Sequence, residues 1–296
     1  LGSAAGGGLP QWNCGCPNCR RARAGDPAVS ARSQSSLAVR AQGGPWYLVN
    51  ASPDVRQQLQ ALAPAAGLRH DPVAEVILTD AELDHTVGLL VLRESARPLR
   101  LRGTDVVRQA LSEAFPALRI LDAYCGVSWS PLVPGTPFRL SDIGGAVLEG
   151  EAFPVSAGDP PKYMRVGGSD PSAVGLEFRD PATGGNAVYA PAVGAMDEPL
   201  LRRMEASDLI LLDGTFWTDD ELPSLGIGSR TARDMGHLPL SGPGGTLERL
   251  GALRGPRKVL VHINNTNPIL DDESPQRRAV EEAGFEVGYD GMTIEL

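Results

Sequence analysis

Acidic residues and a histidine gather in one short stretch of the first third of the chain. Residues 78–89 read LTDAELDHTVGL and follow an apolar run that is typical of a buried strand. The side chains in this stretch that could do chemistry are Asp80, Glu82, Asp84 and His85. Carboxylates and an imidazole where a strand meets a helix could bind a metal ion or transfer protons. The alternative is that Asp80 or Asp84 only caps the N-terminus of the helix.

The other histidines extend this pattern. The chain has only four histidines, and three of them, His85, His237 and His262, follow an apolar segment or stand in a glycine-bracketed loop. Asp213 ends another apolar run, whereas His70 lies in a polar loop and is expected to have no role. In α/β folds, side chains just beyond the C-terminal ends of strands gather at one edge of the sheet. We therefore predict one site built from distant parts of the chain.

A second candidate site is a cluster of thiols near the N-terminus. Cys14, Cys16 and Cys19 form a Cys-x-Cys-x-x-Cys pattern, and Cys125 stands alone. Three thiols this close suit a tetrahedral zinc ion better than a disulfide framework, although a fourth ligand must come from elsewhere. Such a sulfur-rich site would be structural and would clip the loop at residues 1–20 to the core. A redox pair or metal-free thiols are the alternatives.

The glycine-rich start of the chain, residues 2–8, invites comparison with a phosphate-binding loop. It lacks the lysine of a Walker A loop, and Pro10 and the cysteines follow where a helix should begin. We predict instead a tight turn that brings backbone close to the site.

Composition limits the classes of function. A chain of 296 residues can bury a large core, and we predict a single domain over residues 1–296 because no interior linker is visible. The net charge of −9 argues against binding to nucleic acid or to anionic membranes. No apolar run approaches the roughly 20 residues that span a bilayer, and no export signal is visible. The expected location is therefore the cytoplasm.

Apolar periodicity predicts strands that alternate with helices twice, with a β-rich stretch in each half. Strands are predicted at residues 36–39, 46–49, 76–78, 99–102, 147–153, 173–178, 187–189, 208–212, 258–261, 285–289 and 292–295. Helices are predicted at residues 55–62, 86–94, 104–115, 199–205, 245–253 and 274–283. This order favours two sheets between helix layers over one doubly wound parallel sheet.

Several motifs together resemble those of a known family. Beside LTDAELDHTVGL these are LGSAAGGG-x-PQWNC (1–14), RSQSS (32–36), NASPD (50–54) and VHINNTNP (261–268). They resemble the metallo-β-lactamase superfamily over essentially the whole chain, and most closely its members that act in pyrroloquinoline quinone (PQQ) biosynthesis. The resemblance implies an α/β fold, the αβ/βα four-layer sandwich, which agrees with the pattern of elements.

The departures from the superfamily pattern bear on mechanism. The hydrolases of the superfamily hold two metals with a His-x-His-x-Asp-His motif, and Asp80 and Glu82 stand at its two leading histidine positions. Only Asp84 and His85 match. The mid-chain histidine and the bridging aspartate of those hydrolases fall near Ser156 and Pro191. The first metal position is therefore dismantled, and Asp80 and Glu82 are interpreted as substrate contacts or helix caps.

The residues that survive form a different ligand set. Asp84, His85 and His262 offer two imidazoles and one carboxylate, the facial triad of non-haem Fe(II) enzymes, with positions left for dioxygen and substrate. His237 matches the acid–base histidine of the superfamily and could shuttle protons. Asp213 is expected to orient a ligand histidine or, alternatively, to cap the turn that follows it. At the zinc site the resemblance places the fourth ligand at position 265, which is Asn265 here, so this ligand is uncertain.

The resemblance also implies the substrate. It predicts an Fe(II)- and dioxygen-dependent hydroxylase that acts on a tyrosine ring cross-linked to glutamate, the small-molecule precursor of PQQ, with zinc at the structural site. One alternative is a metal-dependent hydrolase that keeps the older chemistry of the superfamily. Another is a non-catalytic carrier that binds PQQ or its precursor for transport to the periplasm. The sequence gives no indication of oligomeric state.

Overall fold

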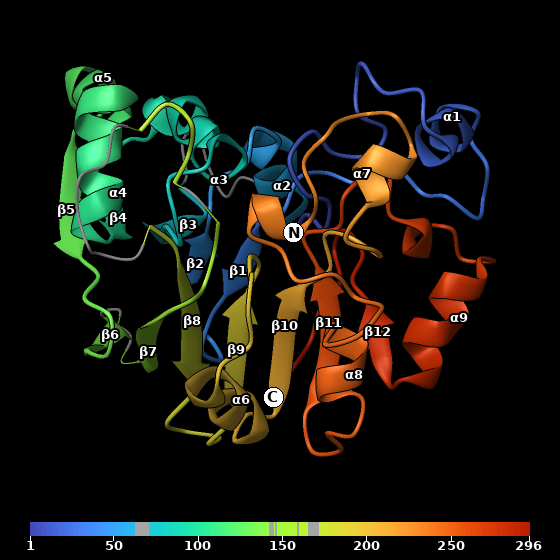
Figure 1. Ribbon diagram of the computed structural model, residues 1–296. Helices are drawn as coiled ribbons and strands as arrows, with labels where there is room; N and C mark the ends of the chain where they lie inside the picture. Colours follow the sequence, from blue (N-terminus) through green and yellow to red (C-terminus); the bar gives the residue numbers. More distant parts are fainter. Residues whose placement is uncertain (63–70, 142–144, 146, 159, 165–171) are drawn as a thin grey trace. The chain divides into compact units, whose positions relative to one another are not determined.

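The computed structural model describes residues 1–62, 71–141, 145, 147–158, 160–164 and 172–296, so that His70 lies outside the described residues. The strands form two mixed sheets (Figure 1). Contacts within the chain define two compact units. Unit 1 comprises Leu1–Gly2, Ser35–Pro154 and Asp159–Gly184, and unit 2 comprises Ser3–Gln34, Val155–Gly158 and Gly185–Leu296. The single domain predicted from the sequence stays a prediction.

Unit 1 is built on a five-stranded sheet in the order β1-β2-β3-β4-β5. Its strands are β1 (Leu37–Val39), β2 (Trp46–Val49), β3 (Val73–Ile77), β4 (Leu99–Gly103) and β5 (Val127–Pro131). The first pair is antiparallel, and the other pairs are parallel. Because β3 lies between β2 and β4, the segment that follows it leaves the sheet near its centre. This placement makes the acidic stretch a central rather than a peripheral feature of unit 1.

Helices pack against this sheet through a continuous apolar core. The helical segments are α2 (Val55–Leu62), α3 (Leu83–Thr86), η1 (Val87–Glu94), α4 (Asp105–Gln109), η2 (Ala110–Ala114) and α5 (Ala117–Tyr124). Their core members include Leu89, Val107 and Leu121, which meet Leu48 and Leu101 of the sheet. Each such fully buried side chain stabilises the fold by roughly 1.5–3 kcal/mol.

The second sheet contributes strands to each unit. In unit 1 these are β6 (Pro137–Ser141), β7 (Val147–Pro154) and β8 (Val174–Arg179), which pair antiparallel. In unit 2 they are β9 (Asn186–Ala190), β10 (Leu209–Asp213), β11 (Arg257–Val261) and β12 (Phe285–Val287), which are parallel in the order β12-β11-β10-β9. All five residues of β10 are buried, as expected of a parallel strand between two neighbours.

Unit 2 carries the remaining helices. They are α1 (Pro17–Arg23), α6 (Glu198–Glu205), α7 (Glu221–Ser224), η3 (Arg233–Met235), α8 (Thr246–Leu250), η4 (Pro268–Leu270) and α9 (Pro275–Glu282), and α9 packs beside β12 (Figure 1). Most of the predicted elements are present, with ends that differ by a few residues. The predicted strand at residues 292–295 is wrong, because that segment pairs with no strand in the described chain.

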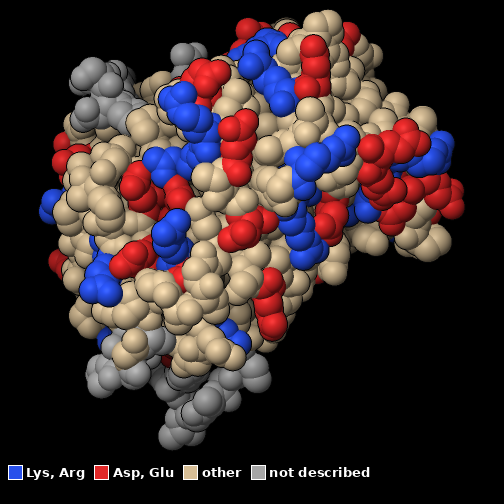
Figure 2. All heavy atoms as spheres, turned by 90° about the horizontal axis from the view of Figure 1, so that it is seen from below, with Lys and Arg blue, Asp and Glu red and all other residues tan. Residues whose placement is uncertain are grey.

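The charged side chains are mixed in sign on the face of the molecule that is seen from below (Figure 2). Figure 2 shows lysine and arginine interspersed with aspartate and glutamate on the face seen from below. No extended basic field covers this face, which agrees with the net charge of −9. Among the described residues, no helix is both long enough and apolar enough to cross a membrane.

Candidate metal centres

His85 is held in unit 1 by the loop that follows β2. The backbone N–H of Ala51 donates to the carbonyl oxygen of His85 at 2.7 Å, and the N–H of Gly88 donates to the carbonyl oxygen of Ala51 at 3.0 Å. A Cβ atom at Gly88 would lie 2.0 Å from the carbonyl oxygen of Ser52, so only glycine permits this close approach. The loop formed by the NASPD motif therefore holds the backbone of the His85 segment in place.

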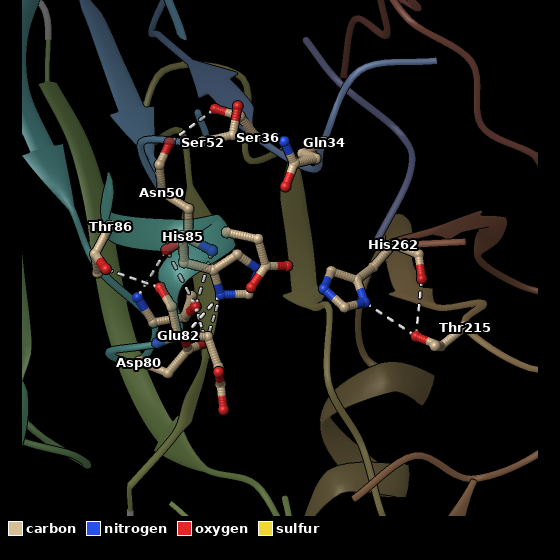
Figure 3. Close-up of polar contacts among 12 residues, drawn as sticks. Gln34, Ser36, Asn50, Ser52, Asp80, Glu82, His85, Thr86, Thr215 and His262 are labelled. Atoms are coloured by element: carbon tan, nitrogen blue, oxygen red, sulfur yellow. Dashed lines mark hydrogen bonds and ion pairs between the residues drawn. The ribbon is translucent and has the colours of Figure 1, made fainter. Parts of the chain in front are cut away.

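The ring of His85 is oriented by Asp80. His85 Nδ1 lies 2.8 Å from each oxygen of Asp80 (Figure 3). The Thr79 hydroxyl donates to Oδ2 of Asp80 at 2.7 Å, and the backbone N–H of Glu82 donates to Oδ1 at 2.9 Å. Both oxygens of Asp80 are therefore engaged, one of them by the backbone N–H of Glu82, the residue before α3. The alternative that Asp80 or Asp84 caps this helix is wrong, because α3 begins without a side-chain cap hydrogen bond. This arrangement favours a positioning role for Asp80 over contact with a substrate.

His85 and the carboxylates beside it shift one another's pKa values. Burial alone would lower the pKa of His85, but Asp80 and Asp84 outweigh it and raise the pKa to about 9. Burial alone would raise the pKa of Asp80, but the facing imidazole and the hydrogen bonds keep it below its usual value. Because Nδ1 faces Asp80, Nε2 is the nitrogen on the side of Asp84, 3.8 Å from Oδ2. A cation at Nε2 would replace the proton that Asp80 and Asp84 now favour.

A second network in unit 2 centres on Asp213 at the end of β10. Asp213 Oδ2 accepts from His237 Nδ1 at 2.7 Å and from the backbone N–H of Val193 at 2.9 Å. Its Oδ1 accepts from the hydroxyl of Thr215 at 2.6 Å and from the N–H of the same residue at 3.0 Å. Val193 stands two residues after Pro191, the position near which the bridging aspartate of the hydrolases was expected to fall, and this loop supplies a backbone donor to Asp213.

His262 joins this network through Thr215. Asp213 and Val261 are partners in the parallel pairing of β10 with β11, so Thr215 and His262 leave the same edge of the sheet. The Thr215 hydroxyl oxygen lies 2.9 Å from His262 Nδ1 (Figure 3). The rings of His237 and His262 are stacked, with their centroids 5.6 Å apart.

The structure thus groups the predicted residues in two sets. Unit 1 brings Asp80, Asp84 and His85 together, and unit 2 brings potential ligand atoms of Asp213, His237 and His262 within 4.8 Å of one another. Burial alone would raise the pKa of Asp213, but His237 and the hydrogen bonds keep it below its usual value. Asp213 therefore acts as an acceptor both for His237 and for the N–H of Thr215 in the turn that follows, so the contacts fit both roles considered for it. That it orients a metal-ligating histidine stays a prediction. That Asp84, His85 and His262 share one metal stays a prediction.

Thr215 is the member of this network that sequence reasoning missed. It was considered only as part of the turn that Asp213 might cap. A threonine two residues after a strand-ending aspartate is a common turn residue, and no periodic signal marks it. Its role depends on the distance to His262, 47 positions further along the chain.

The backbone at His262 is strained. Its φ is +55°, a left-handed value that is uncommon for non-glycine residues. The glycine-rich N-terminal segment lies alongside, because Ile263 N–H donates to the Ser3 carbonyl at 3.0 Å and Ala5 N–H donates to the Ile263 carbonyl at 2.9 Å. The backbone that approaches Ile263 is an extended bridge at Ala4, and the turn at residues 6–7 follows it. That the turn itself brings backbone to the site stays a prediction.

The three N-terminal thiols converge. The Sγ atoms of Cys14, Cys16 and Cys19 all lie within 4.8 Å of one another. Cys16 caps α1, and Gln11 N–H donates to the sulfur of Cys19 at 3.3 Å. Burial raises the pKa of the Cys19 thiol to about 11, so a divalent cation is the partner that would hold all three sulfurs as thiolates. The donor set fits zinc.

Asn265 faces this thiol cluster from the late motif. Its side-chain amide nitrogen lies 3.2 Å from the sulfur of Cys14 and 3.3 Å from that of Cys19. The oxygen and nitrogen of an amide exchange places by a flip, which would turn Oδ1 toward an ion among the sulfurs. Asn18, on α1, donates to the carbonyl oxygens of Asn265 and Asn267 at 3.0 and 2.9 Å. Asn265 as the fourth zinc ligand stays a prediction, and its position supports it.

Glu221 makes a pH-dependent contact beside the same motif. The carboxyl group is buried and accepts hydrogen bonds from Trp217 N–H at 2.7 Å and from the hydroxyl of Thr266. Burial raises its pKa from 4.5 to about 7. An acid whose folded pKa is raised costs stability as pH rises from its unfolded pKa through its folded one.

Replacing Glu221 with glutamine should remove this pH-dependent cost. An amide keeps the size and can accept from Trp217 N–H while donating to Thr266. Relative to the wild type, the variant should gain on the order of 3 kcal/mol of unfolding free energy between about pH 5 and pH 8. Urea unfolding across this range measures the gain, with the exposed Glu248→Gln as the matched control. A difference that does not change with pH would contradict the assignment.

The chain is similar to known proteins over its full length. Residues 45–263 match the model of the beta-lactamase superfamily domain. The chain is 46% identical to coenzyme PQQ synthesis protein B of Methylococcus capsulatus, covering 100% of this chain and 98% of that protein. The corresponding protein of Nitrosococcus oceani is 45% identical, with the same coverage. The chain belongs to the coenzyme PQQ synthesis protein B family.

Solved structures give the same result for the fold. The crystal structure of Zn²⁺-bound PqqB from Methylobacterium extorquens matches with a TM-score of 0.89 and 38% identity, covering 100% of this chain and 98% of that one. A diphosphatase of the PhnP family matches with a TM-score of 0.66 at 17% identity, which speaks for the fold alone. The predicted αβ/βα sandwich is therefore confirmed.

Proposed function

We propose that this protein acts in PQQ biosynthesis as an Fe(II)- and dioxygen-dependent hydroxylase. Its substrate would be the precursor in which a tyrosine ring is cross-linked to glutamate. Membership in the coenzyme PQQ synthesis protein B family supports the pathway. The donor chemistry of the histidine networks supports the reaction class.

One observation carries the proposal against ordinary hydrolysis. Asp80 stands where the two-metal hydrolases have a ligand histidine, yet both of its oxygens are engaged by His85, the Thr79 hydroxyl and a backbone N–H. A carboxylate used in this way orients a ligand and does not hold a second ion. The ligands that remain are Asp84, His85 and His262, and two imidazoles with one carboxylate suit Fe(II). A bound Fe(II) ion would supply the activation of dioxygen.

The protein's own side chains would orient the reacting groups and accept the proton that the substrate loses. His237 donates from Nδ1 to Asp213, so Nε2 carries the lone pair and can accept the proton that the tyrosine ring carbon loses. Phe216 meets the His237 ring edge-on at a centroid distance of 5.9 Å and restricts the ring. In the net reaction one oxygen atom of dioxygen replaces the ring hydrogen as a hydroxyl group. The other oxygen atom leaves as water, which consumes two electrons from an external reductant.

Anaerobic loading with Fe(II) tests the proposal. Protein loaded in this way should consume oxygen when the cross-linked dipeptide and ascorbate are added, and the product should contain one atom from isotopically labelled dioxygen. A chain that is inactive with Fe(II) but hydrolyses phosphodiesters with Zn²⁺ or Mn²⁺ would be a hydrolase. Tight PQQ binding without turnover, unchanged by His85→Ala, would identify a carrier. Either outcome would refute the proposal.

A further inference from the structure

The hydroxyl group of Thr215 lies at the centre of three buried contacts within unit 2. Its oxygen is 2.6 Å from Asp213 Oδ1, 2.9 Å from His262 Nδ1 and 2.8 Å from the carbonyl oxygen of His262. Thr215, Asp213 and His262 are all buried. Three neighbours compete for one hydroxyl proton, so the assignment of that proton decides the state of the histidine ring.

The shortest contact decides where the proton goes. An ionised carboxylate can only accept, so two oxygens 2.6 Å apart need a proton between them, and only the Thr215 hydroxyl can supply it. One proton cannot serve both this contact and the 2.8 Å contact with the His262 carbonyl oxygen, and the shorter contact with the charged carboxylate is the costlier one to leave without a proton. The Thr215 hydroxyl therefore donates to Asp213. With the proton directed at either oxygen, Thr215 can only accept from Nδ1 of His262.

The state of His262 follows from this donation. With its one proton directed at Asp213, the Thr215 oxygen can only accept from its 2.9 Å neighbour, Nδ1 of His262. An Nδ1 atom without a proton would direct its lone pair at a lone pair of the Thr215 oxygen. Nδ1 must then carry the proton, and the lone pair of the neutral ring lies on Nε2.

We infer that Thr215 is a positioning residue that fixes His262 in the Nδ1–H tautomer and directs the Nε2 lone pair to a metal ion. The use of His262 as a ligand rests on the proposed function, whereas the tautomer rests on the contacts alone. Asp213 thereby orients two stacked rings, His237 directly and His262 through one hydroxyl group. In unit 1 the carboxylate of Asp80 contacts Nδ1 of His85 without an intermediary. In both candidate ligands Nδ1 therefore faces an oxygen atom, a carboxylate at His85 and a hydroxyl group at His262.

Nitrogen-15 NMR of histidine-labelled protein reads the tautomer without turnover. Only four histidines need assignment, and His262→Ala identifies the signals of interest. The sample should hold zinc at the thiol cluster and no ion at the histidines, as verified by metal analysis. We expect a protonated Nδ1 and an unprotonated Nε2 at His262 in the wild type. The opposite tautomer in the wild type would overturn the inference whether or not any variant folds.

Removing the hydroxyl group tests its role. Thr215→Val keeps the shape of the side chain, and we expect it to mix the His262 tautomers and to weaken Co²⁺ binding at the histidines by 10–100-fold. Thr215→Ser should restore both properties. Thr246→Val, the same change at another buried threonine of unit 2, is the matched control and should alter neither. An unchanged tautomer with unchanged Co²⁺ affinity in Thr215→Val would overturn the inference.

These results are independent of the hydroxylase assay. If the wild type has the expected tautomer but shows no Fe(II)-dependent oxygen uptake, the proposed function fails and the positioning role of Thr215 stands. If oxygen uptake is observed and Thr215→Val leaves the tautomer unchanged, the proposed function stands and the positioning role fails.

Discussion

Replacing Cys19 with serine is expected to release zinc and to destabilise the protein strongly. Cys19 is fully buried, and its sulfur converges with those of Cys14 and Cys16 at one end of α1. Serine offers a poor ligand to zinc, and the two remaining thiols could not hold the ion tightly. Loss of a structural metal belongs to the class of large mutational effects, so we expect a loss on the order of 3 kcal/mol and a fall in Tm of roughly 6–12 °C.

Metal analysis and thermal unfolding measure these two effects together. Cys125→Ser is the matched control, because Cys125 is a partly buried thiol in unit 1, far along the chain from the cluster. It should retain zinc and change Tm little. Below its unfolding transition, Cys19→Ser should keep Fe(II)-dependent turnover. Loss of turnover in a fully folded Cys19→Ser protein would show that the thiol cluster does more than support the fold.

Strand ends were the most predictable feature of the site. The apolar runs that become β3, β10 and β11 are short and bounded by polar residues, so the residues just beyond them could be placed at a sheet edge from the sequence alone. Asp213 and His262 follow that rule, since β10 and β11 are parallel neighbours in register. The sequence placed Asp213 at this edge but left two roles open for it, orienting a histidine and capping the turn, and the structure shows a contact of each kind.

Local propensity was a poorer guide where tertiary contacts redirect the backbone. Residues 86–94 were predicted as one helix, and the segment instead begins in α3 and continues as the 3₁₀ helix η1. The reason is that Gly88 N–H donates to Ala51 in the NASPD loop, which removes it from α-helical hydrogen bonding. For the similar break between α4 and the π-helical turn η2 we have no physical account.

Most of the side-chain contacts in the two networks could not be predicted from the sequence. Asp80 was interpreted as a substrate contact or a cap, and its contact with His85 depends on how the loop after β3 folds back. The contact of Thr215 could not be predicted because its partner, His262, lies 47 positions further along the chain. Sequence patterns place residues on elements, whereas the choice of proton donor and acceptor depends on distances of a few tenths of an ångström.

The largest loss of activity is expected from His262→Ala. If His262 supplies one of only two imidazole ligands, its removal should weaken Fe(II) binding by more than the roughly 100-fold typical of a residue that merely orients a ligand. Turnover should fall below detection. Stability should fall by about 1–3 kcal/mol, because removing the ring leaves the buried Thr215 oxygen without its partner. Iron content after anaerobic loading and urea unfolding measure the two effects separately.

Two further variants make this result specific to a shared ion. His85→Ala changes a residue of unit 1, yet it should abolish the same iron content and the same oxygen uptake if Asp84, His85 and His262 bind one metal. His237→Gln should keep the iron and lower turnover by roughly 10²–10⁴-fold, as expected when a proton-transfer group is lost. Retention of full iron content by either His85→Ala or His262→Ala would refute the ligand set. Loss of iron in His237→Gln would instead place His237 among the ligands, since its ring stacks on that of His262 at 5.6 Å.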